Sequence, residues 1–265
     1  MPVALTQETI TQQWTAALLR AAITTKIIAM GGWTQEAGTS GNELHFSIDA
    51  PLTSAPKDRA YLRMSVENST TTNIKIQAWG GDGYSANTLQ NQWPIFSDSL
   101  GNSANIAYGS GENFPIKICT FKSAEIALIS GVKADSNQGL FNVGFFFPMT
   151  KADWWDNNSV FGFTPNDSIC SKLRSPLIVP FHNNYSDVNI GIDQGPTNIN
   201  IGGGRDLHKR LILNQSQGNR NTIGQTSADF GILGAGGLSP LSQTQIDGET
   251  WVNLNSSCSV AIRIL

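Results

Sequence analysis

The chain has 265 residues, of which 14% are Asp, Glu, Lys or Arg, and its formal net charge at pH 7 is −3. Globular domains usually carry about 25% charged residues, whereas close to a third of this chain is Ser, Thr, Asn or Gln. Hydroxyls and carboxamides hydrogen-bond well in turns and across hydrated interfaces, but they are weak acids, bases and nucleophiles unless another group activates them. The composition therefore favours a structural or binding protein over an enzyme. The absence of a dense basic region argues against nucleic acid as a partner.

The first residues show neither the basic region nor the apolar run of a secretory signal. The most apolar stretch, residues 15–30, is interrupted by Arg20 and Lys26 and is shorter than the roughly 20 apolar residues of a membrane span. Three cysteines, Cys119, Cys170 and Cys258, are widely spaced and match no zinc or disulfide pattern. We therefore expect synthesis in a reducing cytosol, no membrane insertion and no cofactor.

Residues 6–30 are predicted to form one long amphipathic helix, with Thr6 as its N-cap and Gly31 and Gly32 as its stop. Spacings of three and four gather apolar side chains on one face of this helix: Ile10, Trp14, Ala17, Leu18 and Ala21. Two interpretations remain open. The helix either packs on its own domain or docks on a partner or on sister chains.

Beyond Gly31 the apolar pattern has a period of two, which is typical of β-strands. Turn-forming residues separate the runs, and no helical pattern intervenes, so we expect antiparallel strands in a mainly β, sandwich-like or barrel-like fold preceded by the N-terminal helix. The predicted strands cover residues 44–48, 61–66, 74–78, 115–121, 125–129, 140–147, 177–181, 188–192, 198–201, 210–213 and 257–265. We divide the chain into a docking segment (1–32), a main β-domain (33–201) and, after the hinge at Gly202–Gly204, a smaller β-region (202–265).

Two segments rich in Gly, Ser, Asn and Asp, residues 80–112 and 214–248, are predicted to be long loops. Long loops in compact domains often have a function. These two are expected to bind either a ligand or a neighbouring subunit.

The search for chemistry finds no catalytic or metal-binding pattern. His45, His182 and His208 are isolated, and the chain contains no Gly-x-Ser-x-Gly elbow. Residues 187–193 resemble a calcium loop, but the loop lacks its turn glycine and its closing glutamate. We therefore predict no catalytic residue, and hydrolysis of a polysaccharide is the weaker alternative.

Residues 154–157, Trp154, Trp155, Asp156 and Asn157, place two aromatic rings beside hydrogen-bonding groups. Adjacent residues of a strand face opposite ways, so one tryptophan would be buried and the other exposed. The patch fits the edge of a core, a subunit interface or a contact with a glycan.

A helix ahead of β-structure that is rich in Gly, Ser, Thr and Asn, with few charges, resembles the structural proteins of bacteriophage particles and of phage-derived injection systems. The resemblance implies a virion protein that is made in the host cytoplasm and assembles as symmetric copies, often trimers, in a tail fibre or baseplate. It also implies contacts with other particle proteins and a role in host attachment, including binding of a surface glycan. A capsid-decoration protein and a carbohydrate-binding module or lectin are the alternatives.

If the N-terminal helix docks on a partner, then replacing Ile10 and Trp14 by Ala should impair assembly and leave the β-domain folded. Loss of the cooperative melting transition would instead show that these side chains belong to the core.

Overall fold

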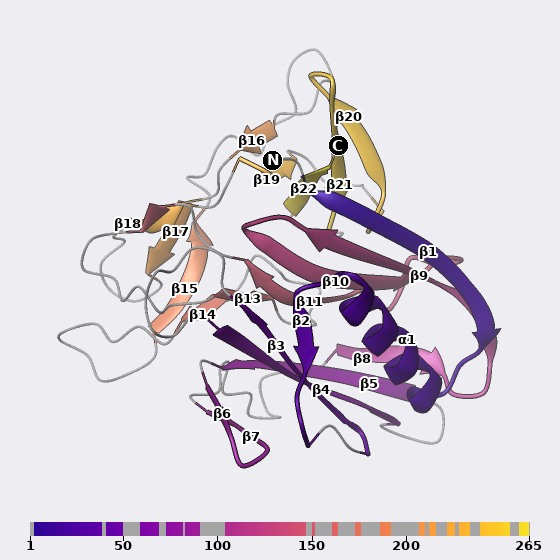
Figure 1. The fold of residues 1–265 in the computed structure, drawn as a ribbon. Helices are drawn as coiled ribbons and strands as arrows, with labels where there is room; N and C mark the ends of the chain where they lie inside the picture. Colours follow the sequence, from indigo (N-terminus) through magenta and orange to yellow (C-terminus); the bar gives the residue numbers. More distant parts are fainter. Residues whose placement is uncertain are drawn as a thin grey trace.

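Figure 1 shows the fold in a computed structural model of the chain. The residues that it describes are 3–38, 41–49, 59–68, 73–81, 83–90, 104–146, 150–151, 161–163, 173–175, 186–191, 207–209, 212–215, 222–225, 228–233, 239–254 and 260–264. The predicted fold class is confirmed. Across these residues the chain is mainly β, with antiparallel sheets in a sandwich-like arrangement and a helix near the N-terminus.

Two five-stranded sheets enclose the main core. The first, which we call the outer sheet, has the order β2-β3-β4-β5-β8, with β2 (Trp33–Gln35), β3 (Glu43–Asp49), β4 (Arg59–Asn68), β5 (Asn73–Gly81) and β8 (Ala104–Gly109). The second, the central sheet, has the order β1-β9-β10-β11-β13, with β1 (Ala4–Gln13), β9 (Asn113–Lys122), β10 (Ile126–Lys133), β11 (Phe141–Phe146) and β13 (Phe161–Phe163). A separate hairpin pairs β6 (Gly83–Ser85) with β7 (Thr88–Gln90).

Two further sheets come from the second half of the chain. The C-terminal sheet has the order β16-β19-β22-β21-β20, with β16 (Leu207–Lys209), β19 (Phe230–Leu233), β22 (Val260–Ile264), β21 (Glu249–Asn253) and β20 (Gln243–Ile246). The fourth sheet has the order β12-β18-β17-β15-β14, with β12 (Thr150–Lys151), β18 (Thr222–Gln225), β17 (Ile212–Gln215), β15 (Ser186–Gly191) and β14 (Leu173–Ser175). Strands from both sides of residue 202 thus share the fourth sheet, and the division into three segments stays a prediction.

Most strands predicted from alternation are present, but the two predicted loops are not continuous loops. Residues 80–112 contain the β6–β7 hairpin and β8, and residues 214–248 contain β18, β19 and β20. These strands are short or rich in polar residues, so their sequences resemble those of turns. The predicted strands at 177–181 and 198–201 and the hinge at 202–204 lie outside the described residues.

The predicted start of the helix is wrong. Residues 4–13 form β1, which pairs along its whole length with β9, and the helix α1 spans Ala16–Ala29. β-Branched residues are frequent in 6–11 and favour a strand. Thr15, rather than Thr6, is the N-cap, and its hydroxyl oxygen accepts the backbone N–H of Leu18 at 3.2 Å. The predicted stop is confirmed, because Gly31 adopts a φ of +73° just after α1.

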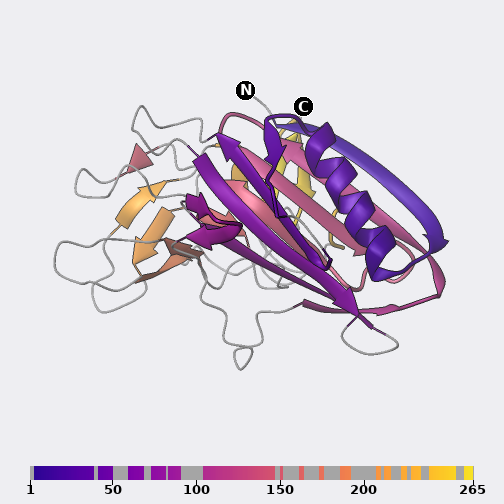
Figure 2. The ribbon, with the colours of Figure 1, turned by 60° about the horizontal axis from the view of Figure 1, so that its bottom comes forward.

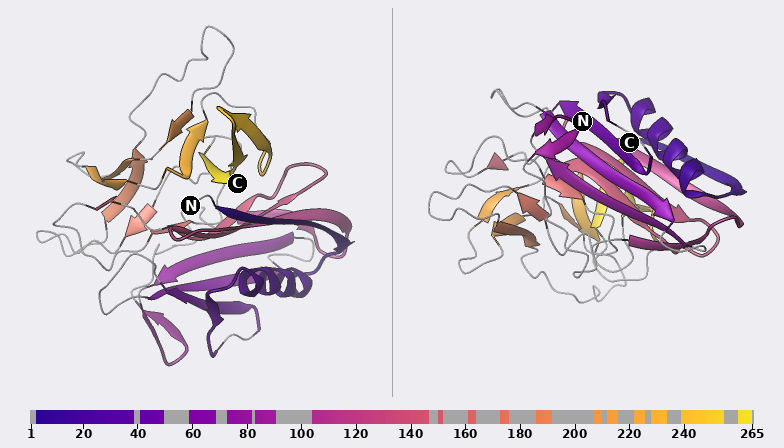
Figure 3. Two further views of the ribbon diagram at one scale, coloured as in Figure 1. Left: turned by 45° about the horizontal axis from the view of Figure 1, so that its top comes forward. Right: turned by 90° about the horizontal axis from the view of Figure 1, so that it is seen from below.

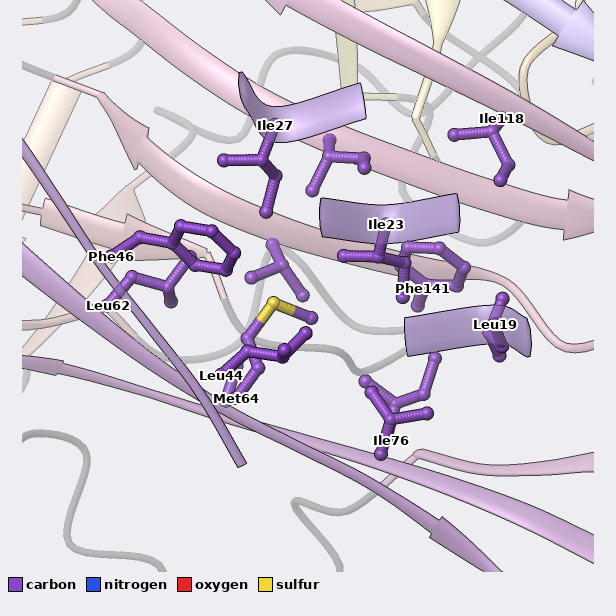
Figure 4. Packing of buried hydrophobic residues seen from close by; sticks show 14 of the residues in the cluster. Leu19, Ile23, Ile27, Leu44, Phe46, Leu62, Met64, Ile76, Ile118 and Phe141 are labelled. Atoms are coloured by element: carbon purple, nitrogen blue, oxygen red, sulfur yellow. The ribbon is translucent and has the colours of Figure 1, made fainter. Parts of the chain in front are cut away.

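The helix fills the space between the outer and central sheets, where it contacts β2 and β4 on one side and β10 on the other (Figure 2). Leu19, Ile23 and Ile27 are fully buried on its inner face. Figure 4 shows them projecting toward side chains of both sheets, among them Phe46, Met64, Ile76 and Phe141. Burial of an aliphatic side chain of this size contributes about 1.5–3 kcal/mol, so this face holds α1 firmly in the core.

The middle strands of the central sheet are covered on both faces. The other face of this sheet meets the C-terminal sheet, as Figure 3 shows. There the Lys117 ammonium donates to the carbonyl of Leu241 at 2.7 Å, and the Asn142 amide donates to the carbonyl of Leu254 at 3.2 Å. Strands buried on both faces lose the alternation of polar and apolar residues. Residues 126–132 of β10 are accordingly buried without interruption.

Replacement of Trp14 by Ala should destabilise the whole chain. Trp14 has no exposed surface, and its indole N–H donates to the carbonyl of Phe114 at 2.9 Å. We expect a loss of about 3–5 kcal/mol in the free energy of unfolding, measured by denaturant titration. Leu18→Ala, on the exposed face of α1, is the control and should cost under about 1 kcal/mol. A Trp14→Ala protein as stable as the control would contradict this assignment.

Candidate functional site

The five residues predicted to dock on a partner do not form one surface. Trp14 is buried in the main core, and Ile10, in β1 opposite Ile116, packs against the same core. Ala17, Leu18 and Ala21 lie on the opposite, exposed side of α1. Contact with a partner therefore stays a prediction for these three, whereas the side chain of Trp14 is not part of the surface.

We call the exposed side of α1 the outer helix face. It consists of Ala17, Leu18, Ala21, Thr25, Ile28 and Ala29 and contains no charged residue. Leu18 and Ile28 are the large hydrophobic residues most exposed in the described part of the chain, each at 42% of the full surface. Because α1 has apolar residues on both sides, one side packs in the core and the other is exposed.

Charged residues border the outer helix face on both flanks without entering it. On one flank Lys26 forms an ion pair with Glu8 of β1. On the other, the guanidinium of Arg20 donates to the carbonyl of Val66 and, at 3.1 Å, to the side chain of Asn42. These contacts tie the helix to β1 of the central sheet and to β4 of the outer sheet, so the outer helix face has a fixed orientation.

A group of interacting polar and aromatic side chains lies on the face of the outer sheet that is turned away from the core. In this polar cluster Glu43 accepts a hydrogen bond from Arg63 and lies 3.2 Å from the imidazole of His45. The Arg63 guanidinium lies 4.8 Å from the centre of the Trp79 ring, and the ring of Tyr84 lies 5.4 Å from that of His45. The hairpin of β6 and β7 thus places Tyr84 over the sheet.

The ionisable groups of the polar cluster neutralise one another. Partial burial by itself raises the pKa of Glu43, but the hydrogen bonds and charges of Arg63 and His45 outweigh it and lower that pKa below its ordinary value of 4.5. Burial, together with the nearby carboxylates of Glu36 and Glu43, raises the pKa of Tyr84. The cluster therefore holds the hairpin of β6 and β7 against the outer sheet.

The sequence pattern alone does not bring the side chains of the polar cluster together. Alternation in residues 43–49 and 61–66 correctly predicts which side chains face the core, and so also which ones face outward. The pairing of His45 with Arg63 across β3 and β4 depends on strand register, and the position of Tyr84 depends on a hairpin inside a predicted loop.

The described residues were also compared with the requirements of a metal site and of a membrane span. Within them no group of three or more His, Cys, Asp or Glu side chains could hold an ion, and no helix is long and apolar enough to cross a membrane. Burial raises the pKa of the Cys119 thiol to about 11, so its reactive thiolate is scarce near neutral pH. Trp154, Trp155, Asp156 and Asn157 lie outside the described residues.

The lowered pKa of Glu43 predicts a pH-dependent contribution to stability. The carboxylate stabilises the fold above its ordinary pKa of 4.5, and this contribution disappears as the pH falls through the lower folded-state value. Glu43→Gln should therefore reduce the free energy of unfolding at pH 7, and the difference from the unmodified chain should shrink toward pH ~3. Asp247→Asn, in the turn after β20, removes the same charge outside the cluster and is the control. A difference for Glu43→Gln that stays constant over this range would contradict the assignment.

No protein-family model matches this chain, and no curated protein shows significant similarity to its sequence.

Proposed function

We propose that this chain is a non-enzymatic structural component of a bacteriophage or phage-like particle, assembling as symmetric copies in the tail. The observation that carries the proposal is the outer helix face, an uncharged apolar surface on a helix that is fixed in the core by its other side. Such a surface suits a permanent contact with another protein, because covering Leu18 and Ile28 removes apolar area from water.

The low charge and the high content of Ser, Thr, Asn and Gln support the same function. Interfaces are depleted in charged residues at their centres, and hydroxyls and carboxamides hydrogen-bond equally well to water and to a neighbouring subunit. A fibre or baseplate protein needs a surface that stays soluble during synthesis and is covered after assembly.

The polar cluster gives less support to a lectin. Tyr61 and Tyr84 stack on each other with their ring centres 6.0 Å apart, and Arg63 covers one face of Trp79. These contacts occupy one face of each ring, which leaves less aromatic surface on which a sugar could stack.

Association with particles is tested by purifying intact phage or tail-like particles from the source culture and analysing them by quantitative mass spectrometry. The chain should be present in a fixed, multiple copy number relative to the other particle proteins. Its presence in the lysate together with its absence from washed, intact particles would rule out the proposal.

The role of the outer helix face is tested by the double substitution Leu18→Lys and Ile28→Lys. Four flexible charged groups per pair of copies would then have to be buried, so assembly should weaken at least about tenfold, as measured by sedimentation. Gln243→Lys with Gln245→Lys adds the same charge on exposed positions of β20 and should leave assembly unchanged. Equal assembly of both variants would exclude the outer helix face as a contact surface.

A further inference from the structure

The strand β1 is an edge strand whose outer side is open. It pairs with β9 on one side, and Figures 1 and 2 show it at the margin of the central sheet. Among the described residues, no strand pairs with residues 4–13 of β1 on the other side. Both ends of this open section are defined, because Val3 forms an isolated bridge with Ile264 of β22, and after Gln13 the chain turns into α1.

Two hydrogen bonds show which backbone groups face the open side. The N–H of Trp14 donates to the carbonyl of Glu112, in continuation of the β1–β9 register, and the N–H of Val3 donates away from β9, to the carbonyl of Arg263. Backbone groups of successive residues in a strand point to alternate sides. The even-numbered residues of β1 therefore bond to β9, and the open groups belong to Leu5, Gln7, Thr9, Thr11 and Gln13.

This edge lacks the features that normally prevent strand addition. Proteins protect an exposed edge with short strands, proline, lysine or bulges. β1 is ten residues long, contains neither proline nor lysine, and pairs with β9 without a shift in register. Its charged residue, Glu8, is held by Lys26 of α1. The edge is therefore a ready template for another strand.

One antiparallel register pairs all five open residues of the edge. If Thr9 lies opposite Thr9 of a second copy, then Leu5 lies opposite Gln13 and Gln7 opposite Thr11, so all five open residues exchange hydrogen bonds. Glu8 then lies opposite Ile10. A shift that centres the pair on Glu8 instead would place two carboxylates opposite each other, which is unfavourable, and would require Val3, which β22 already occupies.

We propose that two copies of this chain associate by antiparallel pairing of β1 with β1 about a two-fold axis at Thr9, which joins their central sheets into one. The inference rests on the proposed function and names the contact by which copies assemble. A two-fold axis perpendicular to the sheet keeps both α1 helices on the same side of it. The outer helix faces of the two copies then lie on the same side of the joined sheet.

The first test removes the central hydrogen bonds. Thr9→Pro deletes an N–H that has no partner within the described chain, so the melting temperature of the separated chain should change little. The dissociation constant of the dimer should rise at least about tenfold, because both Thr9–Thr9 hydrogen bonds are lost. Thr9→Ala keeps the N–H and should associate like the unmodified chain. Sedimentation of the full chain over a range of concentrations measures all three proteins.

The second test reports the register. Residues directly opposite each other in a hydrogen-bonded pair have Cα atoms about 5.5 Å apart, within the range of a disulfide. Thr9→Cys should therefore give a covalent dimer on mild oxidation, with the linked peptide identified by mass spectrometry. Thr6→Cys, which lies opposite Gln12 in this register, is the matched control and should not crosslink to itself.

The outcomes separate the two proposals. An unmodified chain that is monomeric at tens of micromolar, a Thr9→Pro protein that assembles as the unmodified chain does, or a crosslink through position 6 rather than 9 would each overturn the β1 pairing. If the chain is nevertheless found in intact particles, the proposed function stands and the copies meet through another surface. If the β1 dimer forms but the chain is absent from intact particles, the β1 pairing stands and the proposed function is excluded.

Discussion

The packing of α1 between the outer and central sheets is the constraint on which the rest of the structure depends. Leu19, Ile23 and Ile27 fill space that neither sheet could fill alone, because the helix contacts β4 of one and β10 of the other. The sandwich thus has a helix in place of a direct sheet-to-sheet contact along this side. A helix in this position must have an outward face, and in this chain that face is apolar and uncharged.

The same packing links the helix to the edge of the central sheet. Two residues, Trp14 and Thr15, separate β1 from α1, and burial of Trp14 fixes the turn between them. The open edge of β1 and the outer helix face are therefore rigidly related parts of one surface. A partner strand on β1 would gain backbone hydrogen bonds, which give register but little net energy in water. Apolar contacts elsewhere between the two copies must supply the hydrophobic contribution that hydrogen bonds lack.

The sequence predicts the elements whose signals are local. It does not predict those whose secondary structure depends on pairing with a segment far away in the chain. Alternation located β3, β4 and β5, and the glycines after Met30 located the end of α1. The spacing of Ile10 from Trp14 predicted that the helix includes residues 6–13, whereas the β-branched Thr6, Thr9, Ile10 and Thr11 favour a strand. Pairing with β9, about a hundred residues later, decides between them. The polar cluster was equally invisible, since it depends on the register of β3 with β4 and on Tyr84 reaching across from the β6–β7 hairpin.

The scarcity of charged residues affects the edge of the central sheet as well as the supply of catalytic acids and bases. At the edge, it lowers the cost of adding a strand. Threonine and glutamine on β1 are well hydrated in a free chain, which keeps the edge soluble, and they accept a neighbouring strand without the cost of removing charges from water. Lysine at the same positions would also be soluble but would block addition of a strand. A composition poor in charge and rich in hydroxyls and carboxamides therefore permits a protein to remain soluble before assembly and to pair along its edge afterwards, which neither an apolar nor a charged edge would allow.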